Sequence, residues 1–366
     1  MRTPSHSVGL LVFTLLLSSG SFAGCGSDGD AGVPMTMGAP DVLTGAEPLA
    51  GFQLLETTYT VPGTGEQRTL RLNVWYATLD ETGTPARFNA ISVDRSSLVD
   101  ASVRVPRGRA PLMIYSHGDG AWGGANYALS RQFVRNGWIV VAPDHPGLIF
   151  GDNPDPRPFD SAVVRLYDLQ ATLDFMADLP SDHPLAGHVD TERVLVAGHS
   201  LGGQSAWLAG GPAFDLATIE ASCAPSCVQA QLDAYAMYEP DPRVAGIVSL
   251  DGGVSTGLVA DEGFASMIAP AMLITPPDSA SDAALFARSE GADVTWVQLA
   301  GACHNSFTGI LGCPTLPLTT SLPVTATYTL AFGIRHVLQS DDPTLLAILD
   351  GSSEVDPVVT LLHHGP

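Results

Sequence analysis

Apolar residues recur along this chain with two spacings. Short, mostly apolar runs alternate with longer segments in which apolar residues come three or four positions apart. A short apolar run bounded by turn residues predicts a strand buried on both faces, whereas the wider spacing predicts a helix with one apolar face. The predicted buried strands span residues 111–115, 138–142, 194–197, 244–250, 271–275 and 294–299.

Helices are predicted between most of these strands. The clearest spans residues 160–179, and its apolar positions are Val163, Leu166, Leu169, Leu173 and Met176. Shorter helices are expected at residues 126–136, 204–209, 228–238 and 281–290. Strands that alternate with helices form a mostly parallel sheet with right-handed crossovers, so the predicted fold class is α/β.

Three other segments break this alternation. Residues 51–61 and 69–76 alternate apolar and polar positions around a Pro-Gly-Thr-Gly turn, which predicts an antiparallel pair of strands at one sheet edge. Residues 78–109 are polar and are expected to be irregular. Residues 211–241 are interpreted as an insertion, either a lid over a functional site or a peripheral loop.

The beginning of the chain is typical of an export signal. Arg2 is followed by an apolar stretch at residues 8–17, which is too short to span a bilayer comfortably. Phe22-Ala23-Gly24-Cys25 then resembles the lipobox of bacterial lipoproteins, in which the cysteine is acylated. We predict residues 1–24 as a lipoprotein-type signal peptide and Cys25 as a lipid anchor in the cell envelope. An ordinary signal peptide that is cut nearby is the alternative, and either one exports the chain.

The amino-acid composition predicts how the chain after the signal peptide is organised, and it excludes several functions. Residues 25–48 are rich in Gly, Asp and Pro, which predicts a flexible tether before a folded domain at residues 49–366. The 366 residues carry a formal net charge of −22 at pH 7, so the chain would repel nucleic acid. It has no lysine, which excludes a Walker A loop and a Schiff-base lysine.

Cysteine usage agrees with an oxidising compartment. Besides Cys25 the chain has Cys223, Cys227, Cys303 and Cys313, and an even number in an exported chain predicts disulfides. Three pairings are possible, and the simplest joins Cys223 to Cys227 and Cys303 to Cys313. We predict no metal site, because no histidine lies near Cys223 and Cys227.

One buried strand leads directly into a candidate nucleophile. Gly198-His199-Ser200-Leu201-Gly202 fits the pattern G-x-S-x-G, in which the serine occupies a strained turn between a strand and a helix. Gly253-Val254-Ser255-Thr256-Gly257 fits the same pattern. Ser200 is the better candidate, because it follows an apolar run and precedes a predicted helix. Ser255 is expected on a loop.

A serine nucleophile needs a base, and the base needs a carboxylate that orients it. His304 follows the last predicted strand, at a carboxyl end where such a base belongs. The other histidines downstream of Ser200 lie within a predicted helix or in the C-terminal tail. Asp251 and Asp278 each follow a predicted strand, and their spacing alone does not separate them.

The loop after the first buried strand reads Ser116-His117-Gly118-Asp119-Gly120-Ala121-Trp122-Gly123. Beside a nucleophile elbow, a loop at this place supplies one backbone N–H of the oxyanion hole. The loop also fits G-x-G-x-x-G, which is typical of dinucleotide binding. That alternative is weaker, because an antiparallel pair precedes the loop and because Ser200 and His304 would be left unexplained.

Taken together, these motifs resemble the α/β-hydrolase superfamily, and within it the platelet-activating-factor acetylhydrolases and their bacterial dienelactone-hydrolase-like relatives. The resemblance covers roughly residues 58–310 and rests on four stretches. They are Tyr115-Ser116-His117-Gly118-Asp119-Gly120, Gly198-His199-Ser200-Leu201-Gly202-Gly203, Ser249-Leu250-Asp251 and Gly301-Ala302-Cys303-His304-Asn305-Ser306-Phe307.

The resemblance implies an α/β-hydrolase fold and assigns roles to the matching residues. Ser200 is the nucleophile, His304 the base and Asp251, in preference to Asp278, the acid. The backbone N–H groups of Asp119 and Leu201 form the oxyanion hole. The chain departs from the family at Gly252-Gly253, where bulky residues are usual, and at residues 211–241. Both departures bear on the substrate and leave the reaction unchanged.

The sequence therefore predicts an exported serine esterase whose catalytic domain spans residues 49–366. It would act on a small-molecule or lipid ester, without a cofactor, and would bind the membrane through its lipid anchor. A lipase or polyester hydrolase is the alternative within enzymes. Two further alternatives are a non-catalytic surface-binding homologue and a nicotinamide-dependent oxidoreductase.

Overall fold

The central feature of the fold is an 11-stranded sheet. The structure is a computed structural model that describes residues 37–42, 48–89, 92–151, 157–223, 227–277, 279–309 and 312–365. The strand order is β11-β10-β9-β8-β7-β5-β6-β2-β1-β4-β3. The strands are β1 (Ala50–Thr60), β2 (Gln67–Tyr76), β3 (Pro85–Arg87), β4 (Val93–Val99), β5 (Ala110–Ser116), β6 (Ile139–Pro143), β7 (Val189–His199), β8 (Val244–Leu250), β9 (Ala271–Thr275), β10 (Val294–Leu299) and β11 (Val359–His364).

The middle of the sheet is parallel, as the alternation of strands and helices predicted. Strands β6, β5, β7, β8, β9 and β10 pair in parallel with one another in this order, and β11 adds to β10 as an antiparallel strand. Strands β1 and β2 form the predicted antiparallel hairpin, and β2 joins the rest of the sheet by an antiparallel pairing with β6. The predicted α/β fold with an antiparallel N-terminal edge is therefore confirmed.

Residues 78–109 differ from the prediction, because they contain β3 and β4 at the edge of the sheet. Strand β4 escaped notice because several of its buried positions are polar. Asp94 and Ser97 are buried, and the Ser97 hydroxyl donates a hydrogen bond of 2.5 Å to Asp94. Trp75 Nε1 donates to Ser97 Oγ at 3.1 Å. Partners of this kind allow polar residues to enter a core, where a hydropathy pattern does not expect them.

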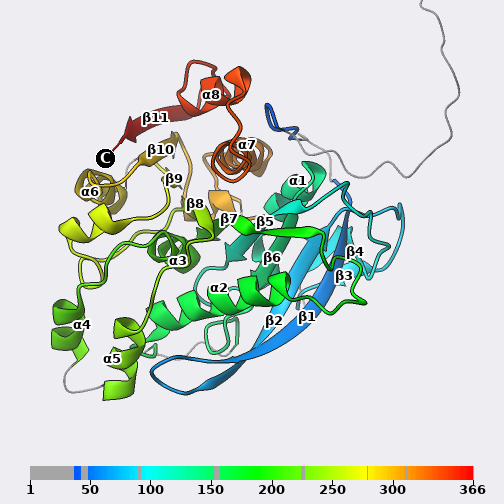
Figure 1. Cartoon of the computed structure of the whole chain (residues 1–366). Helices are drawn as coiled ribbons and strands as arrows, with labels where there is room; N and C mark the ends of the chain where they lie inside the picture. The colour runs from blue at the N-terminus through cyan, green and yellow to red at the C-terminus, as the bar shows by residue number, and fades with distance from the viewer. Residues whose placement is uncertain are drawn as a thin grey trace, which may run out of the picture. The chain divides into compact units, whose positions relative to one another are not determined.

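Helices cover both faces of the sheet (Figure 1). Helices α2 to α6 contribute to the core on one face, and α1, α7 and α8 contribute to the core on the other. The helices are α1 (Tyr127–Arg135), α2 (Ser161–Ala177), α3 (Leu201–Ala209), α4 (Leu216–Cys223), α5 (Gln229–Ala236), α6 (Ala280–Arg288), α7 (Leu318–His336) and α8 (Pro343–Leu349). Short 3-10 helices lie at η1 (Gly123–Asn126), η2 (Asp261–Ser266) and η3 (His304–Phe307). Within the part of the chain described here, no helix is long and apolar enough to cross a bilayer.

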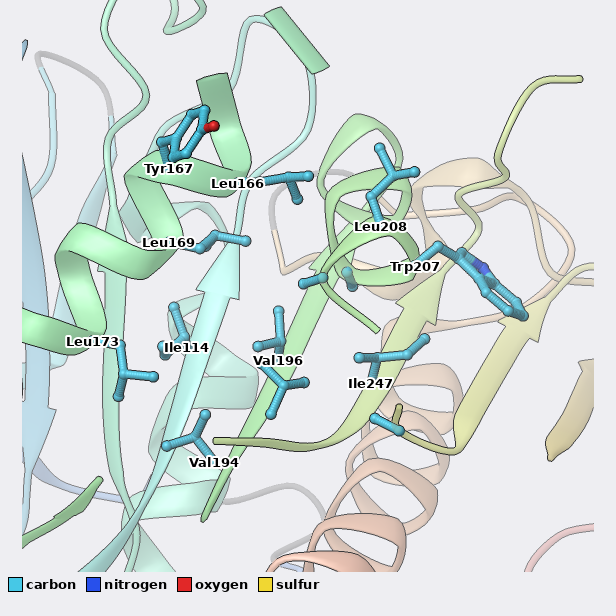
Figure 2. Close-up of a cluster of buried hydrophobic side chains, with 14 of the residues drawn as sticks. Ile114, Leu166, Tyr167, Leu169, Leu173, Val194, Val196, Trp207, Leu208 and Ile247 are labelled. Carbon is cyan, nitrogen blue, oxygen red and sulfur yellow. The ribbon is translucent and has the colours of Figure 1, made fainter. Parts of the chain in front are cut away.

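Successive residues of the central strands face opposite cores, which explains why the buried parts of these strands are mostly apolar. Figure 2 shows the core beneath α2 and α3, where helix residues pack on strand residues. The helix residues labelled there are Leu166, Tyr167, Leu169, Leu173, Trp207 and Leu208, and the strand residues are Ile114, Val194, Val196 and Ile247. Helix α2 carries this face for its whole length, so it holds β5 and β7 in a fixed position.

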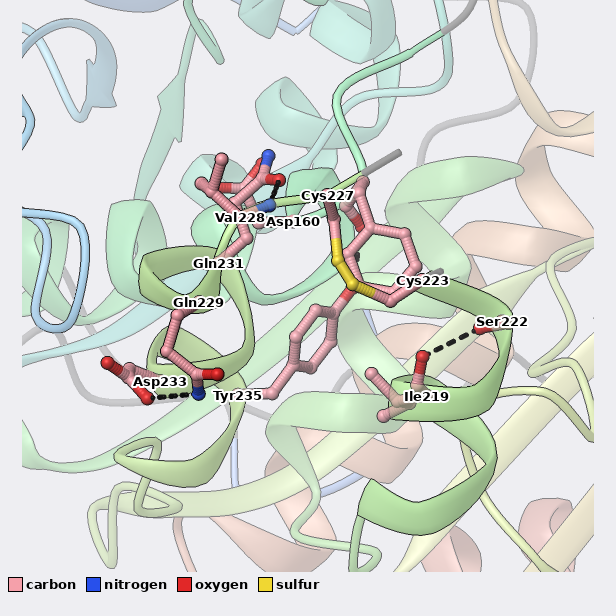
Figure 3. The surroundings of a disulfide bond; sticks show 11 residues. Asp160, Ile219, Ser222, Cys223, Cys227, Val228, Gln229, Gln231, Asp233 and Tyr235 are labelled. Atoms are coloured by element: carbon pink, nitrogen blue, oxygen red, sulfur yellow. Dashed lines mark hydrogen bonds between the residues drawn. A yellow bond between two sulfur atoms is a disulfide. The ribbon is translucent and has the colours of Figure 1, made fainter. Parts of the chain in front are cut away.

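The inserted segment between α3 and β8 folds as two short helices, α4 and α5. Cys223, the last residue of α4, forms a disulfide with Cys227 (Figure 3). Helix α5 packs against α2, where Tyr167 donates a hydrogen bond of 2.9 Å to the Ala234 carbonyl. Tyr235 donates to the carbonyl of Phe159 at 3.0 Å. These contacts attach the segment to the outer side of α2.

Candidate active site

Ser200 lies at the sharp turn between β7 and α3. Its backbone has φ 56° and ψ −120°, a region that residues with a side chain rarely occupy. Its N–H donates to the Leu250 carbonyl at 3.0 Å, and its carbonyl accepts from the Gln204 N–H at 3.1 Å. The surrounding structure therefore holds a strained conformation in place. Because β7 ends at His199, Ser200 lies at the carboxyl edge of the parallel sheet.

Glycines allow three backbone segments to meet at this turn. A Cβ atom on Gly202 would lie 1.9 Å from the Ser116 carbonyl oxygen, and one on Gly198 would lie 2.2 Å from the Gly202 oxygen. A Cβ atom on Gly252 would lie 2.2 Å from the Ser200 oxygen. This contact explains the glycine directly after Asp251, because the start of α3 passes too close for a side chain there. It does not explain Gly253, where the nearest contact of a Cβ atom would be Leu285 Cδ2 at 3.8 Å.

We expect Gly202→Ala to lower the free energy of unfolding by about 3 kcal/mol or more, because the new methyl group would overlap a backbone oxygen that cannot move away. Urea unfolding measures this loss. Gly257→Ala, at the same position of the second G-x-S-x-G match, is the matched control, since its nearest contact would be Ser255 Oγ at 3.6 Å. Equal stability of the two variants would show that the close packing at Gly202 is wrong.

The second G-x-S-x-G match has no elbow geometry. Ser255 is exposed, and its carbonyl accepts hydrogen bonds from the N–H groups of Leu258 at 3.0 Å and Val259 at 3.2 Å. Such bonds define a tight turn after β8, with neither a strand directly before the serine nor a helix directly after it.

The loop after β5 lies directly against Ser200. A Cβ atom on Gly118 would lie 3.3 Å from the Ser200 Cβ. His117 Nδ1 and the Gly118 carbonyl are 2.7 Å apart, and the His145 N–H donates to His117 Nε2 at 3.1 Å. Nε2 therefore accepts, and Nδ1 carries the proton that it donates to Gly118. Carbonyl and N–H point in opposite directions across a trans peptide, so this bond turns the Asp119 N–H away from the His117 ring.

A second N–H comes from the start of α3. Leu201 is the first residue of this helix, and the N–H groups of a helix's first turn have no partner within the helix. Among the described residues, no hydrogen bond occupies the N–H of Asp119 or Leu201. Both groups are thus available beside Ser200, as a donor pair for an oxyanion requires.

His304 begins η3, after β10, and contacts the carboxylate that follows β8. Its Nδ1 lies 2.6 Å from Asp251 Oδ2. This bond leaves Nε2 without a hydrogen-bond partner among the described residues, as the base nitrogen of such a ring would be. Asp251 ends its strand with φ 49°, so it also turns sharply out of the sheet. The structure therefore brings Asp251 and His304 together.

His199, the residue before Ser200, was not identified from the sequence. Its Nε2 and the His304 carbonyl are 2.8 Å apart, and the two rings lie 4.5 Å apart between centroids. Burial lowers the pKa of His199 to about 4, so the ring is neutral at physiological pH. A neutral ring donates to the His304 carbonyl without placing a second positive charge beside the base. His199 thereby ties the elbow to the histidine loop.

The Asp251 contact predicts the pH dependence of activity. The hydrogen bond to Asp251 raises the pKa of His304 above its ordinary value of 6.5. The base works only when unprotonated, so we expect kcat/KM to fall as pH decreases through a value above 6.5. A pH series with an uncharged ester measures this limb. An acid limb at or below the ordinary histidine value would contradict the contact.

The rival carboxylate Asp278 lies outside the described residues. A different acid, Asp282, lies beside Asp251 instead. It is 4% exposed, and its carboxyl group hydrogen-bonds that of Asp251. Burial, together with the Asp251 charge, raises the pKa of Asp282. No sequence pattern predicts that Asp282 lies beside Asp251, because an acidic residue in the first turn of a helix is an ordinary partner of the helix dipole.

Ser200, His304 and Asp119 line one cleft of about 190 Å³. Its other lining residues are Tyr115, Gly118, Ala121, Ala125, His199, Asn305 and Thr308. Arg157 pairs with the Asp119 carboxylate at 2.5 Å, which places a guanidinium beside the oxyanion loop. No residue of 211–241 among those described lines this cleft, so the structure gives the insertion no contact with it.

One of the two predicted disulfides is present. Within the described ranges, Cys223 is bonded to Cys227, whereas Cys303 and Cys313 are free thiols. The hydrogen bond from Cys303 lowers the pKa of Cys313 to about 6, so the two side chains lie side by side.

The loop that fits G-x-G-x-x-G uses one of its glycines for internal packing. A Cβ atom on Gly123 would lie 2.4 Å from Asn73 Nδ2. Where residues are described, no cluster of His, Cys, Asp or Glu could hold a metal ion.

Comparison with known proteins gives the same fold. A model of the alpha/beta hydrolase family matches residues 113–365, which is more than half of the chain. The solved structure of a ferulic acid esterase from Streptomyces cinnamoneus is similar, with a TM-score of 0.61 and 20% sequence identity over 87% of this chain and 98% of that one. No match to a curated protein was found. On the family match, together with its sheet order, the chain belongs to the alpha/beta hydrolase family.

Proposed function

We propose that this hydrolase is an exported serine esterase that cleaves carboxylic esters through an acyl-enzyme. The observation that carries the proposal is the joint placement of Ser200, His304 and Asp251. The 2.6 Å contact between His304 and Asp251 orients the imidazole, and Ser200 lines the same cleft on its strained turn. In an alpha/beta hydrolase, this arrangement supports ester hydrolysis better than nicotinamide-dependent oxidation or surface binding without catalysis.

In the proposed reaction, Ser200 Oγ attacks the ester carbonyl carbon while His304 Nε2 accepts the hydroxyl proton. The carbonyl oxygen becomes an oxyanion, which accepts hydrogen bonds from the N–H groups of Asp119 and Leu201. His304 then gives its proton to the departing alcohol, and an acyl-serine remains. Water, deprotonated by His304, attacks the acyl-serine and releases the acid.

The cleft favours a short acyl group. Its volume of about 190 Å³ is below the range of pockets that hold drug-sized ligands, and small side chains such as Ala121 and Ala125 line it. This supports an acetyl ester or a similar short ester, in line with the resemblance to platelet-activating-factor acetylhydrolases. A lipase or polyester hydrolase is the second candidate, because it would use the same serine, histidine and aspartate on a longer or polymeric ester.

Hydrolysis of a p-nitrophenyl ester series from short to long acyl chains tests both statements. We expect the highest kcat/KM for the shortest esters, with no turnover by Ser200→Ala. A maximum at long chains would favour the lipase. Failure to hydrolyse any member, or to react with a fluorophosphonate, would favour a non-catalytic surface-binding homologue. Binding of a nicotinamide cofactor without ester hydrolysis would favour the oxidoreductase.

The location of the enzyme is a separate proposal that rests on the sequence alone. Cys25 and the predicted signal peptide lie outside the described residues. We expect Cys25→Ser to move the protein from the membrane fraction to the soluble fraction, because the acyl anchor would supply the membrane affinity of an acidic chain. Fractionation of cells that express each form checks this. A Cys25→Ser protein that still sediments with membranes would overturn the lipid anchor.

A further inference from the structure

A guanidinium group is buried directly behind the oxyanion loop. Arg165, on α2, is 0% exposed. Its Nη2 donates to Ser116 Oγ at 2.9 Å and to the carbonyl of His117. Its Nε donates to Ser205 Oγ at 3.0 Å, and Ser205 in turn donates to the Leu201 carbonyl at 3.1 Å. One side chain thus connects the loop that carries Asp119 with the helix turn that carries Leu201.

No carboxylate of the described residues is in direct contact with this arginine. The nearby Asp168 is occupied by other partners, since it accepts from Arg68 Nε at 3.0 Å and Tyr59 OH at 2.6 Å and lies 2.8 Å from His145 Nδ1. Within the described part of the chain, Arg165 forms no salt bridge, and its Nη1 has no hydrogen-bond partner. Among the described residues, the arginine that forms a salt bridge with Asp168 is Arg68, whereas Arg165 interacts with this carboxylate only at longer range.

An unpaired buried charge is costly, so its position needs a reason. Burial lowers the pKa of Arg165 to about 9, which still leaves the group charged at neutral pH. The neighbouring histidines stay neutral, because burial and the Arg165 charge lower the pKa of His145 to about 4 and that of His117 well below its ordinary value. Arg165 therefore places a positive charge behind the loop, on which the Asp168 and Asp119 carboxylates act from a distance.

We propose that Arg165 is a positioning residue for the oxyanion hole, which it assembles from two segments and supports with its positive charge. The planar guanidinium suits this task, because its fixed fork binds acceptors on both segments at once. Its charge lies in a medium of low polarity, on the protein side of the loop, while negative charge develops on the cleft side. The inference rests on the proposed esterase function.

The test compares three variants of the full-length protein. Arg165→Met keeps the length of the side chain and removes its charge and hydrogen bonds, whereas Arg165→Lys keeps the charge and loses the fork. Arg131→Met is the matched control, because Arg131 is also buried, at 2% exposed, but lies on α1 and pairs with Asp94 at 3.2 Å. Urea unfolding establishes the temperature and buffer in which all three are folded.

We expect kcat with a short p-nitrophenyl ester to fall about ten- to a hundredfold in Arg165→Met, somewhat less than after loss of a direct oxyanion donor, with KM within about twofold. The rate of fluorophosphonate labelling should fall by the same factor, because the phosphonyl oxygen occupies the same hole. Arg165→Lys should lose less activity than Arg165→Met. Folded Arg131→Met should keep the wild-type kcat and labelling rate.

Wild-type kcat and labelling in folded Arg165→Met would overturn the proposal, and so would an equal loss of kcat in Arg131→Met. A lysine variant as slow as the methionine variant would overturn the contribution of charge. These results differ from a failure of the esterase proposal itself, in which the wild-type protein would neither turn over the ester nor react with the fluorophosphonate.

Discussion

Ser200→Ala is expected to lower kcat for a short-chain ester by about four to six orders of magnitude and to abolish labelling by a fluorophosphonate. The reaction would lose the atom that forms the acyl-enzyme, and His304 would have no hydroxyl to deprotonate. The residual rate would come from substrate binding and the oxyanion hole alone. The free energy of unfolding should change little, because the strain at this position lies in the backbone rather than in the side chain.

The chain provides its own control for this experiment. Ser255 occupies the same place in the second G-x-S-x-G match, but it lies exposed in a turn after β8. Ser255→Ala should keep nearly the full rate and full labelling. If Ser200→Ala were labelled as well as the wild-type protein, the nucleophile would have to be another residue, and the proposed mechanism would be lost with it.

Asp251→Asn is expected to lower kcat by about 10⁴-fold with little change in KM. Asparagine has nearly the same shape as aspartate, but it does not stabilise the positive imidazolium that His304 becomes in the transition state. Its amide group can also bond Nδ1 in the wrong tautomer, which would place the proton on the nitrogen that must act as the base. Substrate binding does not involve this contact, so the loss falls on kcat.

The comparison variants for this prediction change Asp278 and Asp282, the two other aspartates that could support His304. Asp278→Asn should lose less than about tenfold, because Asp278 follows its strand only after two prolines. A large loss confined to Asp278→Asn would transfer the acid role to that residue. Mild losses in both single variants, with a severe loss in the double variant, would mean that the two carboxylates substitute for each other. Residual activity of Asp251→Asn that disappears in Asp251→Asn/Asp282→Asn would identify Asp282 as the substitute.

The parallel centre of the sheet was predictable, because its strands are buried on both faces. Strands such as β5 and β6 are apolar at nearly every position, which is typical of a short strand buried on both faces. The alternation of β1 and β2 was equally clear, since one face of an edge hairpin meets solvent. Strand β4 was missed because Asp94 and Ser97 are buried with hydrogen-bond partners that only the folded chain supplies.

The candidate site divides in the same way. Ser200, His304 and the loop at Asp119 could be located from the sequence, because each lies within a few residues after a buried strand and parallel strands end at one edge. Each of these motifs consists of residues that are adjacent in the sequence, such as glycines at a tight turn or a histidine after a strand. They can therefore be recognised without knowing which other residues pack against them.

What the tertiary structure decided is which distant side chains support these residues. Asp282 lies beside Asp251, His199 bonds the His304 carbonyl, and Arg165 joins the oxyanion loop to α3. None of these contacts has a characteristic spacing, because each connects elements that are far apart in the chain. Burial also sets their charge: it keeps His199 neutral and leaves Arg165 charged within the core. Hydrogen bonds and desolvation act between residues that only folding brings together. The sequence therefore determined the parallel centre of the sheet and the candidates for the reacting groups, whereas the folded structure alone determined the strand order and the side chains that hold these candidates and set their charge.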